Sequence, residues 1–532
     1  MSRTLLADGL LYDGSGGKPF PADILIEDSK ILQVEPAGKV VFSGAEVKKL
    51  SGLSVSPGWI DPHAHSDASL LAAPEAFGKI SQGITTELSG NCGLSAFPIL
   101  TEEVREHLRV LYSSYDLQPE WTDFRSYAAE LTERQPAINA AFLCGHNTLR
   151  ANAAGYRQQE LTQSQLDGMN SLLAEMLAQG ACGLSTGLLY TPGCFSDENE
   201  LLALLRTVAA HSGVYATHLR SEGDRLEEAV REAVSLSERS GVVLQISHLK
   251  TALPRNWHKL GYVLSMIHDA RQRGVSIHAD RYPYTFSQTS LSIVLDKPYD
   301  KMTDRAIREV LQNDPAAYDQ ALRQLKDSGR DWSRVILSRS KSPAAYGLIG
   351  LTVAEAAERT GKTPAELVME ILRDDVPGSL AAFGGMSEDN LKQILKQEWV
   401  CCGTDETARP TDDSLGRSHP RGFGSFPIFI RLLREEGLRM EQIIRKITSL
   451  PAGIFKLSDR GLIRPGKNAD LVIFQEDELD SPANFHSPHR PANGIRMVYV
   501  NGVPAYDGLS QRVIARAGKI AGTEELSSRR DF

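Results

Sequence analysis

The sequence lacks long hydrophobic runs and blocks of like charge. No apolar run approaches the roughly 18 residues needed to cross a bilayer, and Asp8 interrupts the start of the chain before the apolar part of a signal peptide forms. Lys and Arg total 58 against 67 for Asp and Glu, which gives a net charge of −9 spread along the chain. We therefore expect a soluble, cytoplasmic protein that binds neither nucleic acid nor a membrane surface.

Cysteine is also scarce, with 6 residues in a chain of 532. This number is too low for a disulfide framework, so we expect reduced thiols, some of which are candidate metal ligands. The hydrophobic share of 41% is enough for a large core, and the length suits roughly two or three domains.

Short strands separated by turn residues are predicted at both ends of the chain. They lie at residues 24–26 and 30–34 near the start and at residues 469–474 near the end. Neither end carries enough apolar residues to form a stable unit alone. We therefore expect residues 1–57 and 462–532 to combine in one small β-sandwich.

Residues 58–461 alternate between short apolar runs and longer amphipathic stretches such as 227–239. This alternation is typical of an α/β fold in which helices connect parallel strands. About eight candidate strands are present, as many as a closed (β/α)8 barrel requires. The last connection is too long for one helix, so we expect an insertion near the barrel mouth at about residues 287–345. The candidate strands end near His65, Cys92, His146, Ser185, His218, His248, Asp280 and Asp405.

Three of these strand ends carry the four histidines of interest. His63 and His65 stand at positions i and i+2, which an extended backbone places on the same face. Alone, such a pair is either a metal chelate or an ordinary hydrogen-bonded pair at a strand end. His218 and His248 each end a predicted buried strand, where a barrel gathers its catalytic groups. Together the histidines favour a metal site.

Cys92 and Asp405 end two further predicted strands. Cys92 has three interpretations: inert packing, a thiolate ligand of zinc, or a nucleophile with a histidine as its base. The number of histidines favours the zinc ligand. Asp405 fits a helix N-cap, but a carboxylate beside a metal also accepts a proton from water and delivers it to a leaving amine, as amide hydrolysis requires. We predict this catalytic role for Asp405.

The motifs around these residues resemble a known family. Residues 57–67, PGWIDPHAHSD, resemble the signature of the amidohydrolase superfamily, metal-dependent hydrolases with a (β/α)8 barrel and a composite β-sandwich. Related hydantoinases and dihydroorotases use a carboxylated lysine on the fourth strand, but residues 181–187, ACGLSTG, contain no lysine. Five other motifs, in order along the chain, are similar to those of the N-acyl-D-amino-acid deacylases (D-aminoacylases): SGNCG at 89–93, STGLLYTPG at 185–193, ISHLK at 246–250, DRYPY at 280–284 and HPRGFGSFP at 419–427.

The resemblance implies a zinc enzyme with two metal positions. In this family the residues that match Cys92, His218 and His248 hold a tightly bound zinc ion. Those that match His63 and His65 form a second, weaker metal site.

The resemblance also implies how the substrate is held. Asp405 matches the general acid and base of the family. Lys250, Tyr282 and Arg421 match residues that bind the α-carboxylate of the substrate, and a guanidinium suits bidentate capture of a carboxylate. Tyr190 is expected to line the pocket.

Two departures from the family pattern bear on the substrate. Residues 405–413 are more charged than expected, and residues 290–296 contain no arginine that would bind an acidic side chain. We therefore expect N-acyl-D-amino acids with neutral or apolar side chains, hydrolysed to a carboxylate and a free D-amino acid. The preference for the D-form follows from the resemblance alone.

Three alternatives stay open. A cyclic-amide hydrolase or a dipeptidase for D-residues, both of the same superfamily, would cleave substrates without a free carboxylate or with a second residue. A catalytically silent barrel used for binding is less favoured, because the set of candidate metal ligands is complete.

Overall fold

Strands from both ends of the chain pair in one sheet. The computed structural model describes residues 3–40 and 44–521, so residues 522–532 of the predicted terminal unit lie outside the described part. The sheet has nine strands, and β5 from the first part of the chain pairs antiparallel with β18 from the last part, with Val55 opposite Ile473. The strands are β1 (Arg3–Leu11), β2 (Phe20–Glu27), β3 (Lys30–Pro36), β4 (Glu46–Lys49), β5 (Ser54–Pro57), β18 (Leu471–Phe474), β19 (Ile495–Val500), β20 (Val503–Asp507) and β21 (Arg512–Val513).

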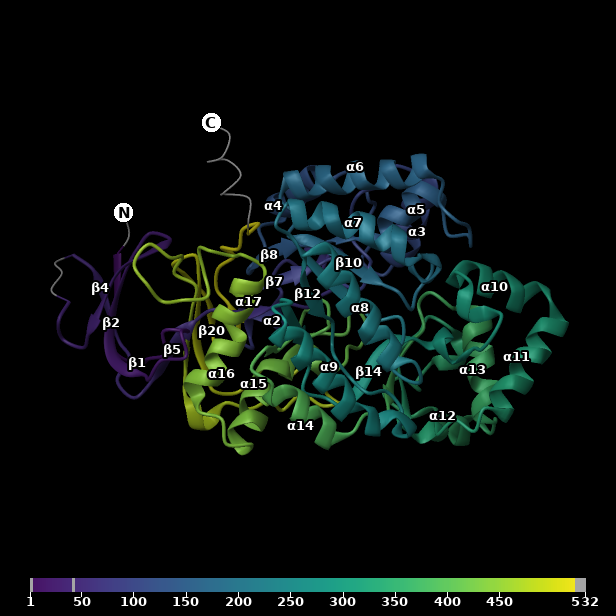
Figure 1. Ribbon diagram of the computed structural model, residues 1–532. Coiled ribbons are helices and arrows are strands. Elements are labelled where there is room, and N and C mark those ends of the chain that lie inside the picture. The colour runs from purple at the N-terminus through teal and green to yellow at the C-terminus, as the bar shows by residue number, and fades with distance from the viewer. Residues whose placement is uncertain (1–2, 41–43, 522–532) are drawn as a thin grey trace.

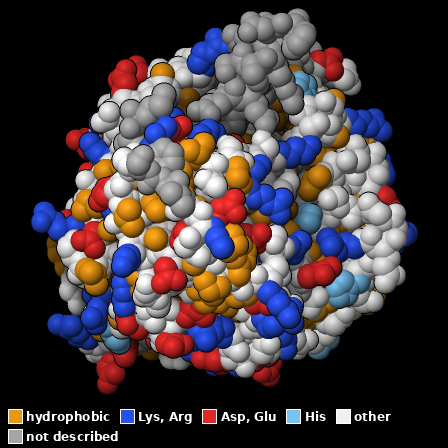
Figure 2. Space-filling view, turned by 90° about the vertical axis from the view of Figure 1, so that its left-hand side faces the viewer, with side chains coloured by type: hydrophobic (Ala, Val, Ile, Leu, Met, Phe, Trp, Pro, Cys, Tyr) orange, Lys and Arg blue, Asp and Glu red, His pale blue; other side chains and the backbone are white. Residues whose placement is uncertain are grey.

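The apolar core beside this sheet draws on both ends of the chain. Leu6, Ile24 and Val55 from the first strands share one buried cluster with Ile473 and Tyr499 from the last strands. Each end therefore buries its apolar residues against the other. Figure 1 shows these strands at the left of the molecule, and Figure 2 shows this end of the surface, where basic, acidic and apolar side chains are interspersed.

The central strands are parallel and follow one another in chain order. One sheet has the order β6-β7-β8 and another the order β9-β10-β11-β12-β13-β17, and only Leu143 separates β8 from β9. An isolated parallel bridge between Ala64 and Glu406 joins the segments that follow β6 and β17. The expected α/β class is confirmed. The strands are β6 (Trp59–Asp61), β7 (Ile84–Ser89), β8 (Asn139–Phe142), β9 (Cys144–Gly145), β10 (Gly183–Gly187), β11 (Val214–His218), β12 (Val243–Ile246), β13 (Ile277–Asp280) and β17 (Val400–Cys401).

Amphipathic helices connect and cover these strands. In α8 the buried residues Leu226, Val230 and Ala233 recur every three or four positions, which places them on one face of the helix, and that helix contacts β12. It ends at Gly241, whose φ of +74° suits glycine. The helices are α1 (Ser69–Ala72), α2 (Phe77–Ile80), α3 (Glu102–Leu111), α4 (Phe124–Arg134), α5 (His146–Ala154), α6 (Gln163–Gln179), α7 (Glu198–Ala210), α8 (Leu226–Ser240), α9 (Leu260–Gln272), α14 (Glu388–Lys396), α15 (Arg421–Glu435), α16 (Met440–Ile447) and α17 (Ser449–Ile454).

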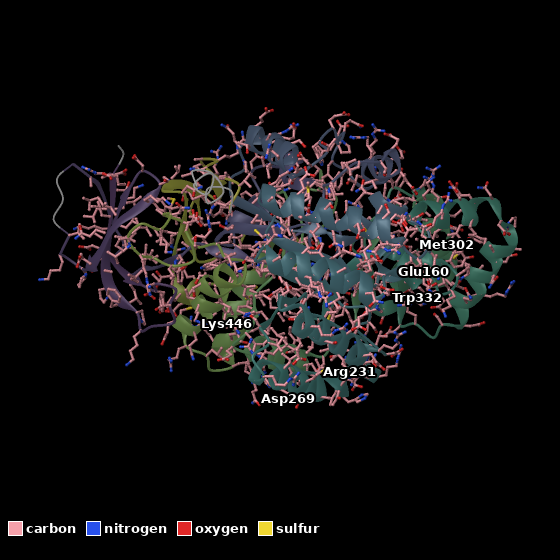
Figure 3. All side chains as sticks on the ribbon, turned by 45° about the horizontal axis from the view of Figure 1, so that its top comes forward. Glu160, Arg231, Asp269, Met302, Trp332 and Lys446 are labelled. Carbon is pink, nitrogen blue, oxygen red and sulfur yellow. The ribbon has the colours of Figure 1, made fainter. Side chains whose placement is uncertain are left out.

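A separate unit lies between β13 and β17, at the end of the molecule opposite to the terminal strands (Figure 1). It has an antiparallel sheet of order β14-β16-β15 and its own apolar cluster, against which Met302 and Trp332 pack (Figure 3). The cluster reaches Ala381, past residue 345 where the insertion was expected to end, because β16 pairs with both other strands. The elements are β14 (Phe286–Ser290), α10 (Asp304–Asn313), α11 (Pro315–Asp327), β15 (Val335–Arg339), α12 (Val353–Thr360), α13 (Pro364–Asp374) and β16 (Leu380–Gly384).

A buried ammonium group ties β6, β7 and the segment after β17 together. The Lys79 side chain is fully buried, and its Nζ lies 2.7 Å from Asp61 Oδ2 and 3.1 Å from Glu87 Oε2. The same Nζ donates to the Thr404 hydroxyl at 2.7 Å and to the carbonyl of Glu406 at 2.9 Å. Burial lowers the pKa of Lys79, but the two carboxylates raise it by more, so the group stays charged.

Within the described residues, no helix combines the length and the apolar character that a membrane span requires.

We predict that Lys79→Met destabilises the protein strongly. The substitution keeps the approximate volume of the side chain but leaves Asp61 and Glu87 buried without their cation, which costs about 3–5 kcal/mol. Urea denaturation followed by circular dichroism measures the loss. Lys326→Met, which removes an exposed pair with Glu366, is the matched control and is expected to have little effect. Equal midpoints for both variants would contradict the structural role of Lys79.

Candidate active site

The candidate ligands gather at the carboxyl ends of the central strands. His218 is the last residue of β11, while His63 and His65 follow β6, Cys92 follows β7 and His248 follows β12. Asp405 follows β17. Parallel strands that pair in sequence bring their carboxyl ends to one face, so residues far apart in the chain become neighbours.

Three of these residues have a strained backbone. Cys92, His248 and Asp405 have φ angles of +53°, +36° and +52°, a region that residues with a Cβ seldom adopt. Glycines flank Cys92 because the chain packs tightly there. A Cβ at Gly90 would lie 2.2 Å from the carbonyl oxygen of Leu143, and a Cβ at Gly93 would lie 2.2 Å from Asn147 Oδ1.

One potential metal site consists of Cys92, His218 and His248. Their ligand atoms lie within 4.8 Å of one another, and Cys92 Sγ is 3.5 Å from His248 Nε2. His218 is buried, and neither of its ring nitrogens has a hydrogen-bond partner. Buried polar atoms are rarely left without a partner, and one sulfur with two imidazole nitrogens is a donor set that zinc accepts. These residues therefore fit a zinc ion.

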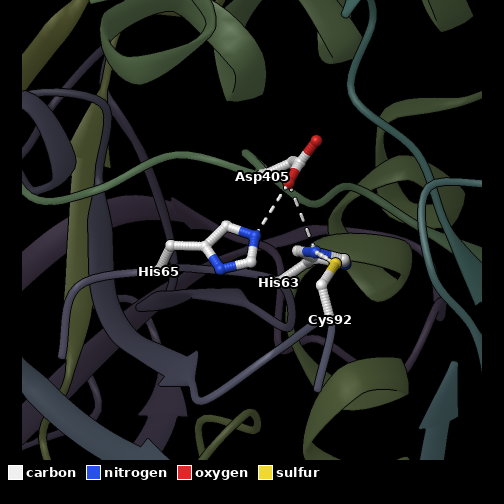
Figure 4. Close-up of side chains that lie close together, drawn as sticks. All are labelled: His63, His65, Cys92 and Asp405. Atoms are coloured by element: carbon white, nitrogen blue, oxygen red, sulfur yellow. Dashed lines mark hydrogen bonds and ion pairs between the residues drawn. The ribbon is translucent and has the colours of Figure 1, made fainter. Parts of the chain in front are cut away.

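A second group shares Cys92 and adds His63, His65 and Asp405 (Figure 4). Asp405 Oδ1 lies 3.0 Å from His65 Nε2 and 3.3 Å from His63 Nε2. Cys92 Sγ lies 3.4 Å from His63 Nε2. The shared sulfur makes the two groups adjacent, and the Asp405 carboxylate belongs to the second group.

Two carboxylates with no role predicted from the sequence contact the Nδ1 atoms of His63 and His248. Asp280 Oδ1 lies 3.0 Å from His63 Nδ1, and Glu222 Oε1 lies 2.9 Å from His248 Nδ1. Each contact leaves the Nε2 atom directed at the site. Metal-binding histidines commonly donate the N–H of the other ring nitrogen to a carboxylate in this way. Asp280 ends a predicted strand, which was a usable signal. Glu222 lies in the loop between β11 and α8, and no spacing or periodicity in the sequence pointed to it.

The surrounding charges favour the ionised forms of Cys92 and Asp405. Burial raises the pKa of the Cys92 thiol, but His63 and His248 outweigh it and hold that pKa well below its ordinary value. Burial also raises the pKa of Asp405, yet Arg421, His248 and the hydrogen bonds from the other histidines hold it well below its ordinary range. Asp405 is therefore a carboxylate, able to accept a proton.

All four residues expected to contact substrate border the site. Arg421 Nη1 lies 2.6 Å from Asp405 Oδ2, and the Arg421 guanidinium lies 4.8 Å from the centre of the Tyr282 ring. The buried Tyr282 hydroxyl has no hydrogen-bond partner, and the Tyr190 ring centre lies 4.9 Å from that of His218. Lys250 Nζ contacts Glu222 and lies 2.8 Å from His248 Nδ1. The structure thus joins two candidate metal groups, an ionised carboxylate and two cations.

Comparisons with known proteins agree with this arrangement. A model of the amidohydrolase family matches residues 46–506. N-acyl-D-glutamate deacylase from Alcaligenes xylosoxydans xylosoxydans is 32% identical, over 98% of this chain and 98% of that protein. D-aminoacylase from the same organism is 32% identical, over 94% of this chain and 94% of that protein.

A solved structure is similar over the same extent. The crystal structure of N-acyl-D-glutamate deacylase from Bordetella bronchiseptica, complexed with zinc and a phosphonate inhibitor that mimics the tetrahedral intermediate of the reaction, has a TM-score of 0.80 at 29% identity. The match covers 98% of this chain and 99% of that chain. The family predicted from the motifs is confirmed: the chain belongs to the amidohydrolase family, in the branch of the D-aminoacylases and N-acyl-D-amino-acid deacylases.

Proposed function

We propose that this protein is a zinc-dependent hydrolase that cleaves the amide bond of N-acyl-D-amino acids, releasing a carboxylate and a free D-amino acid. The observation that carries the proposal is the pair of donor groups that share Cys92, one of which includes the ionised Asp405. The relatives are deacylases of N-acyl-D-amino acids, one of them complexed with zinc. In this proposal Cys92, His218 and His248 hold the tight zinc ion.

His63 and His65 would hold a second, weaker metal ion. Zinc, when bound, supplies Lewis-acid polarisation of the acyl carbonyl and makes the attacking water more acidic. The other steps belong to residues of this chain.

Asp405 carries the proton in this mechanism. Its carboxylate accepts a proton from the water that attacks the acyl carbon, and then donates that proton to the amide nitrogen as the carbon–nitrogen bond breaks. The contacts with His63 and His65 hold Oδ1 at the centre of the site. The contact with Arg421 holds Oδ2.

Lys250, Tyr282 and Arg421 would bind the α-carboxylate of the substrate. Two cations and a hydroxyl without a partner suit an anionic group. Both cations contact protein carboxylates in this structure, so the substrate carboxylate would share them with Asp405 and Glu222. Tyr190 would line the pocket beside His218.

The strand order supports a closed (β/α)8 barrel at residues 58–461, completed by the bridge between Ala64 and Glu406. Residues 1–57 and 462–532 would form the composite β-sandwich around the nine-stranded sheet. The insertion would run from about residue 286 to residue 384, the range of β14 to β16.

We predict that Asp405→Asn lowers kcat by about 10²–10⁴-fold, because the amide cannot carry the proton. Zinc content, measured by elemental analysis, is expected to stay near that of the unmodified protein. Asp412→Asn is the control, because it removes an exposed carboxylate from the same loop. A kcat equal to that of the control would refute the role of Asp405.

We also predict which substrates are cleaved. Zinc-loaded protein is expected to release amino acids from N-acetyl-D-methionine and N-acetyl-D-leucine but not from their L-forms, and to act more slowly on N-acetyl-D-glutamate, because residues 290–296 contain no arginine. Chromatography of the released amino acids measures this. Faster cleavage of the acidic substrate would reverse the side-chain assignment. Cleavage of hydantoins or D-dipeptides alone would favour the alternative functions.

A further inference from the structure

Glu222 contacts both parts of the proposed site. It lies in the loop between β11 and α8, and its side chain is 16% exposed. Its Oε1 atom lies 2.9 Å from His248 Nδ1 and also contacts Lys250 Nζ. One carboxylate oxygen therefore touches a candidate zinc ligand and a candidate binder of the substrate carboxylate.

The loop that carries Glu222 is held in place by the segment after β12. The backbone N–H of Ala252 donates to the carbonyl oxygen of Glu222 at 2.8 Å. Lys259 Nζ donates to the carbonyl oxygen of Asp224 at 2.6 Å, and Asn256 donates to the Asp224 side chain at 3.0 Å. The position of the carboxylate is thus set by the same segment that carries His248 and Lys250.

The short distance between His248 and Lys250 explains why an acceptor such as the Glu222 carboxylate is needed between them. Lys250 Nζ lies only 2.8 Å from His248 Nδ1. An ammonium group donates hydrogen bonds and accepts none, so Lys250 and a protonated Nδ1 would be two donors facing each other. Glu222 supplies the acceptor that both need.

Without Glu222, Lys250 and His248 would form a different hydrogen bond. Lys250 would donate to Nδ1, and the proton of the neutral imidazole would then move to Nε2. The Nε2 atom is the one directed at Cys92 Sγ, 3.5 Å away. A protonated Nε2 cannot bind a metal, since the ligand nitrogen must carry a lone pair.

We propose that Glu222 is a positioning residue that makes the metal-binding tautomer of His248 compatible with a protonated Lys250 next to it. The proposal rests on the proposed zinc function. It couples metal binding at His248 to carboxylate binding at Lys250 through one shared acceptor, Glu222 Oε1, while Glu222 Oε2 lies 3.9 Å from His218 Nε2.

Zinc affinity tests the proposal without reference to turnover. The full-length protein and its variants are titrated with zinc against a competing chelator, and KM and kcat are measured on an N-acetyl-D-amino acid. Glu222→Ala is expected to weaken zinc binding by about 10–100-fold. Lys250→Met is expected to raise KM with little change in zinc affinity.

The double variant gives the decisive comparison. In Glu222→Ala/Lys250→Met no ammonium donates to Nδ1, so we expect zinc binding tighter than in Glu222→Ala, while KM stays high. Glu222→Gln, which keeps an acceptor oxygen but loses the charge, is expected to raise KM more than it weakens zinc binding. Glu228→Gln, which changes an exposed acid in the first turn of α8, is the control.

Two results would overturn the proposal: zinc affinity of Glu222→Ala equal to that of Glu228→Gln, or zinc affinity of the double variant no better than that of Glu222→Ala. Thermal denaturation of each variant identifies a general folding defect. If Glu222→Ala has such a defect, Glu222→Gln replaces it in the measurements, and a zinc affinity and a KM both equal to those of the control would overturn the proposal. A zinc-binding protein that cleaves no N-acyl-D-amino acid would refute the proposed substrate but would leave the zinc titrations as a test of Glu222. A protein that binds no zinc would refute both.

Discussion

The convergence of parallel strand ends is the constraint on which the site depends. Every strand from β6 to β13, and β17 after the inserted unit, runs in the same direction, so the residues after their last hydrogen bonds meet at one face. The buried ammonium of Lys79 holds this face where β6, β7 and the segment after β17 meet. Because Asp61 also accepts from the N–H groups of His63 and Thr404, the same ion cluster reaches the residues that carry the chemistry.

Within that face, two carboxylates leave His63 and His248 with one ring nitrogen each directed at the site. Asp280 and Glu222 take the Nδ1 atoms of His63 and His248, and the Nε2 atoms turn toward Cys92. Asp280 also accepts from the backbone N–H of His248, which helps to hold that residue at a positive φ. The strained backbone and the hydrogen bonds are thus parts of one arrangement that fixes the directions of the candidate ligand atoms.

Local patterns in the sequence identified the parts of the site that depend on strand ends. His63 and His65 were recognisable from their spacing, and His218 and His248 from the apolar runs before them. Glu222 was not recognisable, because its contacts depend on the path of a loop, which no periodicity encodes. The same limit applies to the insertion: helices α12 and α13 have the amphipathic pattern of helices that cover the central strands, and only the pairing of β16 assigns them to the separate unit.

The sheet built from both ends of the chain has a consequence for synthesis. Strand β5 pairs with β18, so its partner is made only after more than 400 intervening residues have left the ribosome. Until then one edge of the first strands has unpaired N–H and C=O groups, and such an edge pairs readily with other chains. The nascent protein therefore keeps this β-edge unpaired during most of its translation, until β18 is made and covers it.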